Sequence, residues 1–408
     1  MEAWRKNLYS LWTAQFVAMI GLSMVVPFLP LYLRELGVKG DEAVKIWSGL
    51  IFAAPFMVGA FLQPIWGVLG DRYGRKPMIV RAMMGLALAN FLMGFAQTAP
   101  QLLGLRLFQG SLAGFVAPSL ALMASCTPEK RMGQSLGTLQ SALVTGMIVG
   151  PLLGGFLTHL MGYRLIFFGT AFTCFAAALI VLRQVQEKFE GAKKKQPARL
   201  RENLTYVFHS PTLRTMILLL ILVQLSLQIA TPFMSLYVEH LKVSPDYIGL
   251  MTGLVFGITG VTNALTAPMW GKRGDRIGYG KILSYSLLGM TLASLPQAFV
   301  TNAYQLLALR GALGIFVSGV MPTVNTIVQR STDEHRRGGI YGIFQSGLLV
   351  GNVFGPLLGG MLAAYLGLRM ILLINGGIMG LAFLWLRKTL PPVPPAILPV
   401  PNPEKNSP

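Results

Sequence analysis

Twelve stretches without a charged side chain run through the sequence, and each is long enough to cross a membrane as a helix. The hydrocarbon core of a bilayer takes about 20 consecutive apolar residues in helical form. The composition agrees, because 53% of the 408 residues are hydrophobic and only 12% are charged. The sequence therefore predicts an all-α protein that crosses the lipid bilayer twelve times. The stretches are Leu8–Leu33, Ile46–Gly70, Ala82–Leu105, Leu107–Pro128, Met132–Tyr163, Leu165–Leu182, Thr215–Val238, Tyr247–Gly271, Ile282–Leu309, Gly311–Gln329, Gly338–Leu368 and Met370–Leu386.

The basic residues are concentrated in every second segment between these stretches. If the first helix starts in the cytoplasm, the cytoplasmic segments hold 26 Lys and Arg residues and the external loops hold six. This bias is the positive-inside pattern of membrane proteins. We therefore expect both termini in the cytoplasm, and we attribute the net charge of +19 to topology and not to a nucleic-acid partner.

The chain also repeats itself at a constant spacing. The block "PFLPLYLREL" at Pro27 matches "PFMSLYVEHL" at Pro232, and "PIWGVLGDRYG" at Pro64 matches "PMWGKRGDRIG" at Pro268. Every matched block is offset by 204 or 205 residues. The repeat predicts two pseudo-symmetric bundles of six helices, an architecture of secondary transporters. The expected parts are residues 1–185, a basic cytoplasmic linker 186–212, residues 213–389 and a proline-rich, disordered tail 390–408.

The hexapeptide "GPLLGG" lies inside one predicted span of each half. Glycines spaced four residues apart form a small face that lets two helices approach closely, while the proline removes one internal hydrogen bond. A role in coupling the halves and plain helix packing both account for this pattern. The residues concerned are Gly146, Gly150, Pro151, Gly154, Gly155, Gly355 and Pro356.

The segment "GVLGDRYGRK" connects the second and third spans. Glycines permit a tight turn, and the carboxylate of Asp71 can pair with neighbouring cations or cap a helix N-terminus. A contact of this kind could break and re-form as the halves move, although a basic loop that only sets topology is the alternative. The second copy has Tyr279 in place of Arg75. The candidate gating residues are Gly67, Asp71, Arg72, Gly74, Arg75, Lys76, Asp275 and Arg276.

Arg106 separates the charge-free stretches Ala82–Leu105 and Leu107–Pro128 and is expected one or two turns inside the fourth helix, and Arg310 is its equivalent in the second half. A permanently charged side chain inside a membrane is costly, so it indicates a functional position. The alternative is that the side chain extends to the outer interface, since the helix is expected to begin near Gln101.

Three motifs in the same order resemble the major facilitator superfamily. They are "GVLGDRYGRK", "LLGLRLFQGSLAG" and "GMIVGPLLGG", and the similarity extends over the whole chain except the tail. The resemblance implies the fold of that family and is greatest to its twelve-span drug–proton antiporters that export multiple drugs. It further implies a bacterial inner-membrane protein, expected to be a monomer, that expels small molecules against inward proton flow. It places proton transfer or substrate contact at Arg106, Gln109 and Gly110, with a sugar or metabolite exporter as the alternative.

The sequence departs from many exporters of cationic drugs in one respect. All 15 acidic residues lie at span ends, in loops or at termini, so no carboxylate is expected at mid-membrane. The proton then depends on rim carboxylates such as Glu35 or Asp71, or on water organised by Arg106. Neutral amides remain as pocket candidates and suit amphipathic or uncharged substrates, although helix–helix hydrogen bonds are the alternative. They are Gln15, Gln140, Gln224, Gln228 and Gln345.

Enzymatic activity is not expected. The sequence has no HExxH zinc motif and no GxxxxGK[ST] phosphate loop, which two large classes of enzymes require. Its two cysteines form neither a disulfide framework nor a metal cluster with the four histidines. We expect no cofactor and no metal.

The charge bias yields a direct test of topology. Reporter tags fused to either end of the chain should both be cytoplasmic, because short basic segments are retained on that side. Protease protection of the tags in intact cells and in inverted vesicles measures this. An external tag at either end would contradict the twelve-span arrangement.

Overall fold

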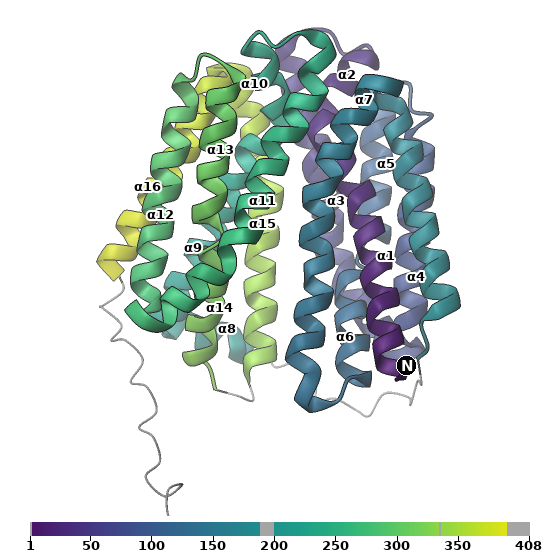
Figure 1. Cartoon of the computed structure of the whole chain (residues 1–408), viewed down its shortest axis with the longest axis vertical. Helices are drawn as coiled ribbons and strands as arrows, with labels where there is room; N and C mark the ends of the chain where they lie inside the picture. Colours follow the sequence, from purple (N-terminus) through teal and green to yellow (C-terminus); the bar gives the residue numbers. More distant parts are fainter. Residues whose placement is uncertain (1, 188–199, 334–335, 390–408) are drawn as a thin grey trace, which may run out of the picture.

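The computed structural model describes residues 2–187, 200–333 and 336–389, and in these ranges every regular element is helical. Twelve helical segments are long and apolar enough to span a membrane, so the predicted fold class is confirmed (Figure 1). The first half contains α1 (Ala3–Val25), α2 (Leu29–Glu35), α3 (Asp41–Tyr73), α4 (Arg75–Met93), α5 (Ala99–Leu112), α6 (Val116–Cys126) and α7 (Met132–Gln184). The second contains α9 (Pro211–Ala230), α10 (Met234–His240), α11 (Pro245–Ile277), α12 (Tyr279–Ser294), α13 (Ala303–Val317), α14 (Val320–Arg330), α15 (Arg337–Leu366) and α16 (Leu368–Thr389).

The helix ends do not coincide with the ends of the charge-free stretches. The third and fourth spans are Arg75–Met93 and Ala99–Cys126, so the stretch Ala82–Leu105 covers parts of both. Helices continue past a charge where it reaches the headgroup region, and they stop where the backbone is capped. Thr98 caps α5 and Asn302 caps α13, each accepting a hydrogen bond from the backbone N–H three residues later. The caps are 204 residues apart, which makes them repeat equivalents.

A glycine in the left-handed region separates the last two spans of each half. Gly162 has φ +76° within α7, between the spans Met132–Leu160 and Gly162–Gln184. Its equivalent Gly367 has φ +83° between α15 and α16. A side chain is strained at such angles, so a glycine allows this tight reversal without a loop.

We call the end of the molecule that holds Glu2, the turn at Gly74 and α8 (Leu200–His209) the linker face, and the end with the turns at residues 36–40 and 241–244 the distal face. The ribbons of the two halves lie close together toward the distal face and diverge toward the linker face (Figure 1). α8 lies inside the segment expected to be the linker. Residues 188–199 of that segment and the predicted tail 390–408 lie outside the described residues.

Within each half, the glycine face of the hexapeptide helix packs on the first helix of that half. A Cβ built at Gly146 would lie 2.7 Å from the Met19 Cβ, and one built at Gly154 would lie 2.7 Å from the Met24 carbonyl oxygen of α1. In the second half, Gly351 and Gly355 approach Gln224 and Gln228 of α9 in the same way. Small residues therefore bring backbones together where lipid offers no hydrophobic force between helices.

Replacement of Gly150 by leucine should destabilise the first half. A side chain at Gly150 collides with Ser23 and with the Ile20 carbonyl, so α1 must move away, at a cost of roughly 1–3 kcal/mol. We expect a lower Tm and lost export, with insertion into the membrane retained.

Gly137→Leu is the matched control, because Gly137 lies on the same helix and a Cβ added there would meet no other atom within 4 Å. Thermal unfolding of the purified variants compares them. Equal Tm values for Gly150→Leu and Gly137→Leu would show that the close approach contributes nothing to stability.

Candidate functional site

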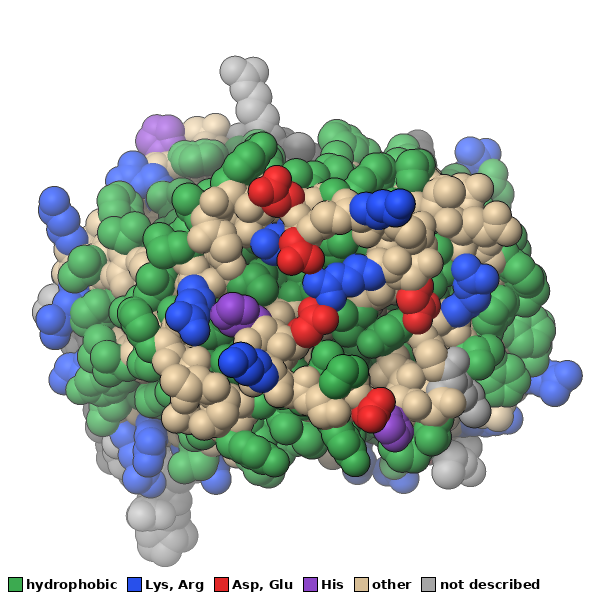
Figure 2. All heavy atoms as spheres, turned by 90° about the horizontal axis from the view of Figure 1, so that it is seen from above, with side chains coloured by type: hydrophobic (Ala, Val, Ile, Leu, Met, Phe, Trp, Pro, Cys, Tyr) green, Lys and Arg blue, Asp and Glu red, His purple; other side chains and the backbone are tan. Residues whose placement is uncertain are grey.

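An ion pair joins the two halves at the distal face. The Arg34 Nη1 donates to both carboxylate oxygens of Glu239 at 2.7 Å, and its Nη2 donates to Asp41 at 3.1 Å. Seen from the distal side, acidic and basic side chains alternate across the centre of this face (Figure 2). A second polar contact between the halves links the His159 Nδ1 to the Asp246 carbonyl oxygen at 2.7 Å, beside the stacked rings of His159 and Tyr247.

Arg34 and Glu239 are equivalent positions of the internal repeat. They are 205 residues apart, within the aligned blocks that begin at Pro27 and Pro232. Equivalent residues meet where the pseudo-two-fold axis passes between the halves, and two identical charges would repel each other there. The two copies have instead diverged to opposite signs, which makes the contact attractive. This pair was not predicted from the sequence, although the aligned blocks carry the opposite charges.

Two pairs of backbones come into close contact just below this ion pair. A Cβ built at Gly49 of α3 would collide with the Pro356 carbonyl oxygen of α15, and one built at Gly253 of α11 would collide with the Pro151 carbonyl oxygen of α7. Gly49 is equivalent to Gly253, and Pro151 is equivalent to Pro356. We call these two contacts the glycine seats. Each seat joins one half to the other.

The hexapeptide therefore has two packing faces. Gly150 and Gly154 face the first helix of their own half, while the Pro151 carbonyl and Gly155 face α11 of the other half. A Cβ at Gly155 would lie 2.5 Å from the Gly249 carbonyl oxygen. A bulkier residue in either position would separate the halves. The hexapeptide occurs twice because the pseudo-symmetric interface needs one seat on each side.

At the linker face, the loop motif is held by partners from the first half. The carboxylate of Glu187 accepts hydrogen bonds from the backbone N–H groups of Arg75 and Lys76 at 2.8 and 2.7 Å, which caps the N-terminus of α4. The Arg75 guanidinium donates to the Ala121 carbonyl and lies 3.9 Å from Asp71. Gly74 has φ +99° in the turn between α3 and α4. Glu187 was not predicted as a partner of this loop, because it was assigned to the linker.

The other predicted loop residues are less constrained. A Cβ added at Gly67 would meet no other atom within 4 Å, and Arg72 lies over the Tyr73 ring at 5.4 Å. In the second copy, the Tyr279 hydroxyl donates to Asp275 at 2.5 Å, while Arg276 is exposed. The two loop motifs thus use different contacts.

Both arginines within the spans are buried. Arg106 is 8% exposed and donates from Nη1 to the Gln109 Oε1 at 3.0 Å, one turn further into the span. Arg310 is 7% exposed and donates to the Met234 sulfur at 3.4 Å. The Nε of each has no hydrogen-bond partner among the described residues. Gly110 lies directly against the Pro55 carbonyl, which brings α5 onto α3.

The predicted pocket amides fall into three groups. Gln224 and Gln228 both donate to the Asn352 Oδ1, at 2.7 and 2.8 Å, and form a partly exposed cluster between α9 and α15. Gln140 and Gln345 are exposed and lie outside this hydrogen-bonded cluster. Gln15 is fully buried, and its amide has no partner in the described part of the chain. Asn352 was not among the predicted site residues.

The described residues include no group of three or more His, Cys, Asp and Glu side chains that could hold a metal ion. Gly133–Gly137 matches the GxSxG pattern of serine hydrolases, although the sequence analysis overlooked it. Ser135 is 1% exposed inside α7, whereas that pattern requires an exposed serine on a strand-to-helix turn. The matching segment is therefore helical and lacks the geometry that this pattern has in serine hydrolases.

Known proteins match more than nine-tenths of the chain. The family model described as "Major Facilitator Superfamily" matches residues 11–250 and 216–407. A multidrug resistance protein MdtG of Proteus mirabilis (strain HI4320) is 36% identical over 391 residues, which are 94% of this chain and 96% of that protein. The MdtG of Salmonella arizonae is 36% identical over 376 residues, covering 92% and 93% of the two chains. The predicted resemblance to multidrug exporters is confirmed.

Solved structures share the fold at low sequence identity. An inward-facing, unoccupied bacterial homologue of the human lysosomal transporter Spinster has a TM-score of 0.76 at 16% identity and covers 95% of this chain and 98% of its own. The nucleoside transporter NupG has a TM-score of 0.79 at 11% identity, with 94% and 98% coverage.

Reversing one charge of the distal ion pair should open the distal face. Arg34→Glu places three carboxylates together, whereas Arg34→Glu with Glu239→Arg restores an attractive pair. Half-exposed ion pairs contribute up to about 1 kcal/mol, which corresponds to roughly a five-fold change in an equilibrium. We expect a maleimide to label Thr158→Cys several-fold faster in the single variant and near the starting rate in the double variant.

The labelling background is Cys126→Ser with Cys174→Ala, which removes the two native thiols. Thr158 is suitable because it is 9% exposed and lies against Gly249 of the other half. Equal labelling rates in all three proteins would mean that the ion pair does not hold the face closed.

Proposed function

This chain belongs to the major facilitator superfamily, and we propose on that premise that it is a secondary transporter that expels small molecules, including several drugs, in exchange for protons. Full-length similarity to multidrug resistance proteins supports the direction and the class of cargo. The observation that carries the proposal is the paired glycine seats, which close the halves against each other at one face only. Such an interface suits alternating access, in which two rigid halves rock about a central site.

Closure at the distal face corresponds to a state that is open toward the linker face. To reach the opposite state, both glycine seats and the Arg34–Glu239 pair must part. A proton that binds Glu239 removes one charge of the pair and so favours the parted state. At the linker face, the polar contacts of Asp71 and Arg75 within the described residues are with each other, with Ala121 and with Glu187. We propose that the loop motif contacts the second half once the linker face closes.

The substrate class follows from the polar groups at mid-span. Gln224 and Gln228 lie near the middle of the span Pro211–His240, Asn352 lies near the middle of α15, and all three are neutral. The Asn352 Oδ1 accepts two hydrogen bonds, while its Nδ2 remains a donor for a substrate oxygen. We propose uncharged or amphipathic substrates with hydrogen-bond acceptors.

The basic-residue bias supports cytoplasmic termini, so the linker face is placed in the cytoplasm. The protein is then a multi-pass protein of the bacterial inner membrane. We further propose that it works as a monomer, since the central pathway lies between the halves of one chain.

The function is tested with cells that lack their main efflux pumps. Expression of the protein should raise the inhibitory concentration of several unrelated amphipathic drugs, and a proton uncoupler should abolish the difference. Gly150→Leu at equal membrane abundance serves as the inactive control. Unchanged susceptibility to every drug, with uphill flux of a sugar or metabolite in vesicles, would replace the drug assignment by that of a metabolite exporter.

Arg106 should be required for coupling. Its guanidinium keeps its proton at physiological pH, so it acts as a fixed positive charge that orients Gln109 and water. We expect Arg106→Ala to abolish substrate-induced proton release in proteoliposomes, and Arg106→Lys to retain little of it, since lysine lacks the planar fork of donors.

Substrate binding, measured by fluorescence quenching, should survive at least partly in both variants. Arg310→Ala provides the comparison in the second half, where the partner is Met234 instead of an amide. Normal proton release from Arg106→Ala would remove Arg106 from the coupling mechanism.

A further inference from the structure

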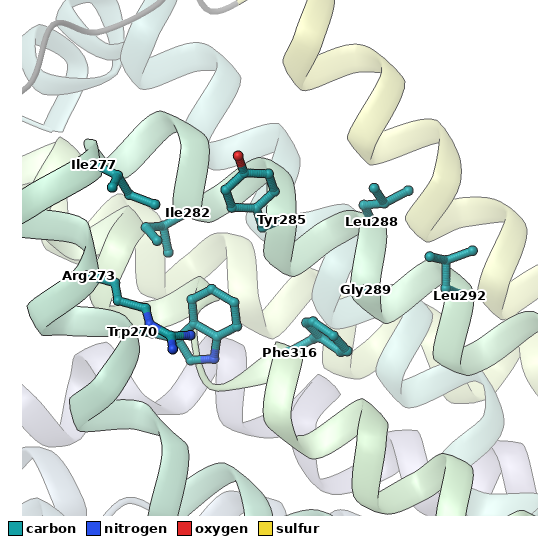
Figure 3. A pocket seen from close by; sticks show the side chains of 9 residues that line it. All are labelled: Trp270, Arg273, Ile277, Ile282, Tyr285, Leu288, Gly289, Leu292 and Phe316. Atoms are coloured by element: carbon teal, nitrogen blue, oxygen red, sulfur yellow. The ribbon is translucent and has the colours of Figure 1, made fainter.

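A groove of about 480 Å³ lies on the outer side of the second half, away from the interface between the halves. It runs between α11, α12 and α13, and α12 lies at the edge of the molecule (Figure 1). Its volume falls in the range of small-molecule sites, about 300–1,000 Å³. Figure 3 shows Arg273, Ile277 and Ile282 at one end and Leu288 and Leu292 at the other.

The length of the groove matches one leaflet of a membrane. The residues of α12 that line it extend from Ile282 to Leu292, which corresponds to about 15 Å of helix. This is half of the hydrocarbon core of about 30 Å. Gly289 forms part of the floor, because a side chain there would collide with the Phe316 ring. The groove can therefore hold one acyl chain that runs from the linker-side surface to the midplane.

The end of the groove at the linker face is basic. The segment 272–281 holds Lys272, Arg273, Arg276 and Lys281, and its one acidic residue, Asp275, accepts a hydrogen bond from the Tyr279 hydroxyl. Arg273 is exposed and lies over the Trp270 ring at 5.9 Å. Tryptophan and tyrosine at this depth mark the headgroup region.

The equivalent position of the first half is built differently. Leu69 stands at the position of Arg273, and Arg81 stands at the position of Tyr285. The Arg81 guanidinium lies directly on the Trp66 ring, 3.5 Å from its centroid. In the second half the cation is Arg273, which lies at the mouth of the groove, where the phosphate of a lipid can reach it.

We propose that this groove binds one anionic glycerophospholipid of the linker-side leaflet, with an acyl chain along α12 and the phosphate beside Arg273. The apolar wall accepts the chain, and the basic rim selects the headgroup charge. The site lies outside the pathway proposed for substrate, so lipid binding does not require transport.

Native mass spectrometry of the full chain in detergent tests the site by titration with phosphatidylglycerol and with phosphatidylcholine. We expect one lipid to bind with preference for phosphatidylglycerol, and Arg273→Leu to weaken its apparent affinity about five-fold, the effect of one cation near an anionic headgroup. Leucine is the residue at the equivalent position of the first half, so folding should be retained. Arg183→Leu, which removes an exposed cation from the last turn of α7 in the first half, is the matched control and should change the affinity less than two-fold.

Phospholipids with brominated acyl chains give a second readout, since they quench a nearby tryptophan. The quenching that belongs to Trp270 is identified by its loss in Trp270→Phe. This quenching should appear at a lower fraction of brominated phosphatidylglycerol than of brominated phosphatidylcholine. Equal affinity for the two lipids, equal losses in Arg273→Leu and Arg183→Leu, or displacement of the bound lipid by a transported dye would overturn the proposal. The last result would make the groove an entry site for substrate.

Discussion

Close approach of helix backbones is the constraint on which this structure depends. In a bilayer, an apolar side chain gains little by leaving lipid for a neighbouring helix, so association relies on packing and on short-range polar contacts. Glycine provides that packing in two directions on the hexapeptide helices, toward the first helix of the same half and toward the other half. The first contact makes each half rigid. The second lets the rigid halves meet at one face through small areas that can separate without unfolding either half.

Because the two halves are repeats, the interface between them is pseudo-symmetric, and its function depends on the positions at which the two copies differ. The two glycine seats are copies of each other, so they would part and close together. The contacts that break the symmetry are those that involve charge or hydrogen bonding. Arg34 meets Glu239 as opposite charges at equivalent positions, and the amide cluster at Asn352 exists in the second half, where the first half has Met147 at the corresponding position. Substrate and proton selectivity would then come from these differences.

Much of the fold could be predicted from the sequence, because membrane spans appear as long apolar stretches and the duplication appears as matched blocks at a constant spacing. The twelve spans, the duplication and the close-packing role of the hexapeptide were all predicted. Helix ends were not, since Arg106 interrupts a charge-free stretch in the middle of a helix, while α3 begins at the charged Asp41. The contacts of Glu187 and Asn352 were also missed, because each depends on which helix packs beside it. The opposite charges of Arg34 and Glu239 can be read from the aligned repeats. They predict an ion pair only once the two copies are known to face each other.

Alternating access through this interface requires that the distal contacts open as one unit while the linker face closes. Paired spin labels measure both ends in the same protein, with Lys39 and Thr301 as exposed distal sites and Gln134 and Gln329 as exposed sites toward the linker face. Electron–electron distance distributions are recorded in nanodiscs at neutral and acidic pH, with and without a transported drug. We predict a longer distal distance and a shorter linker-face distance that appear together and in the same fraction of molecules. A distal distance that stays unchanged in protein that transports the drug would contradict it.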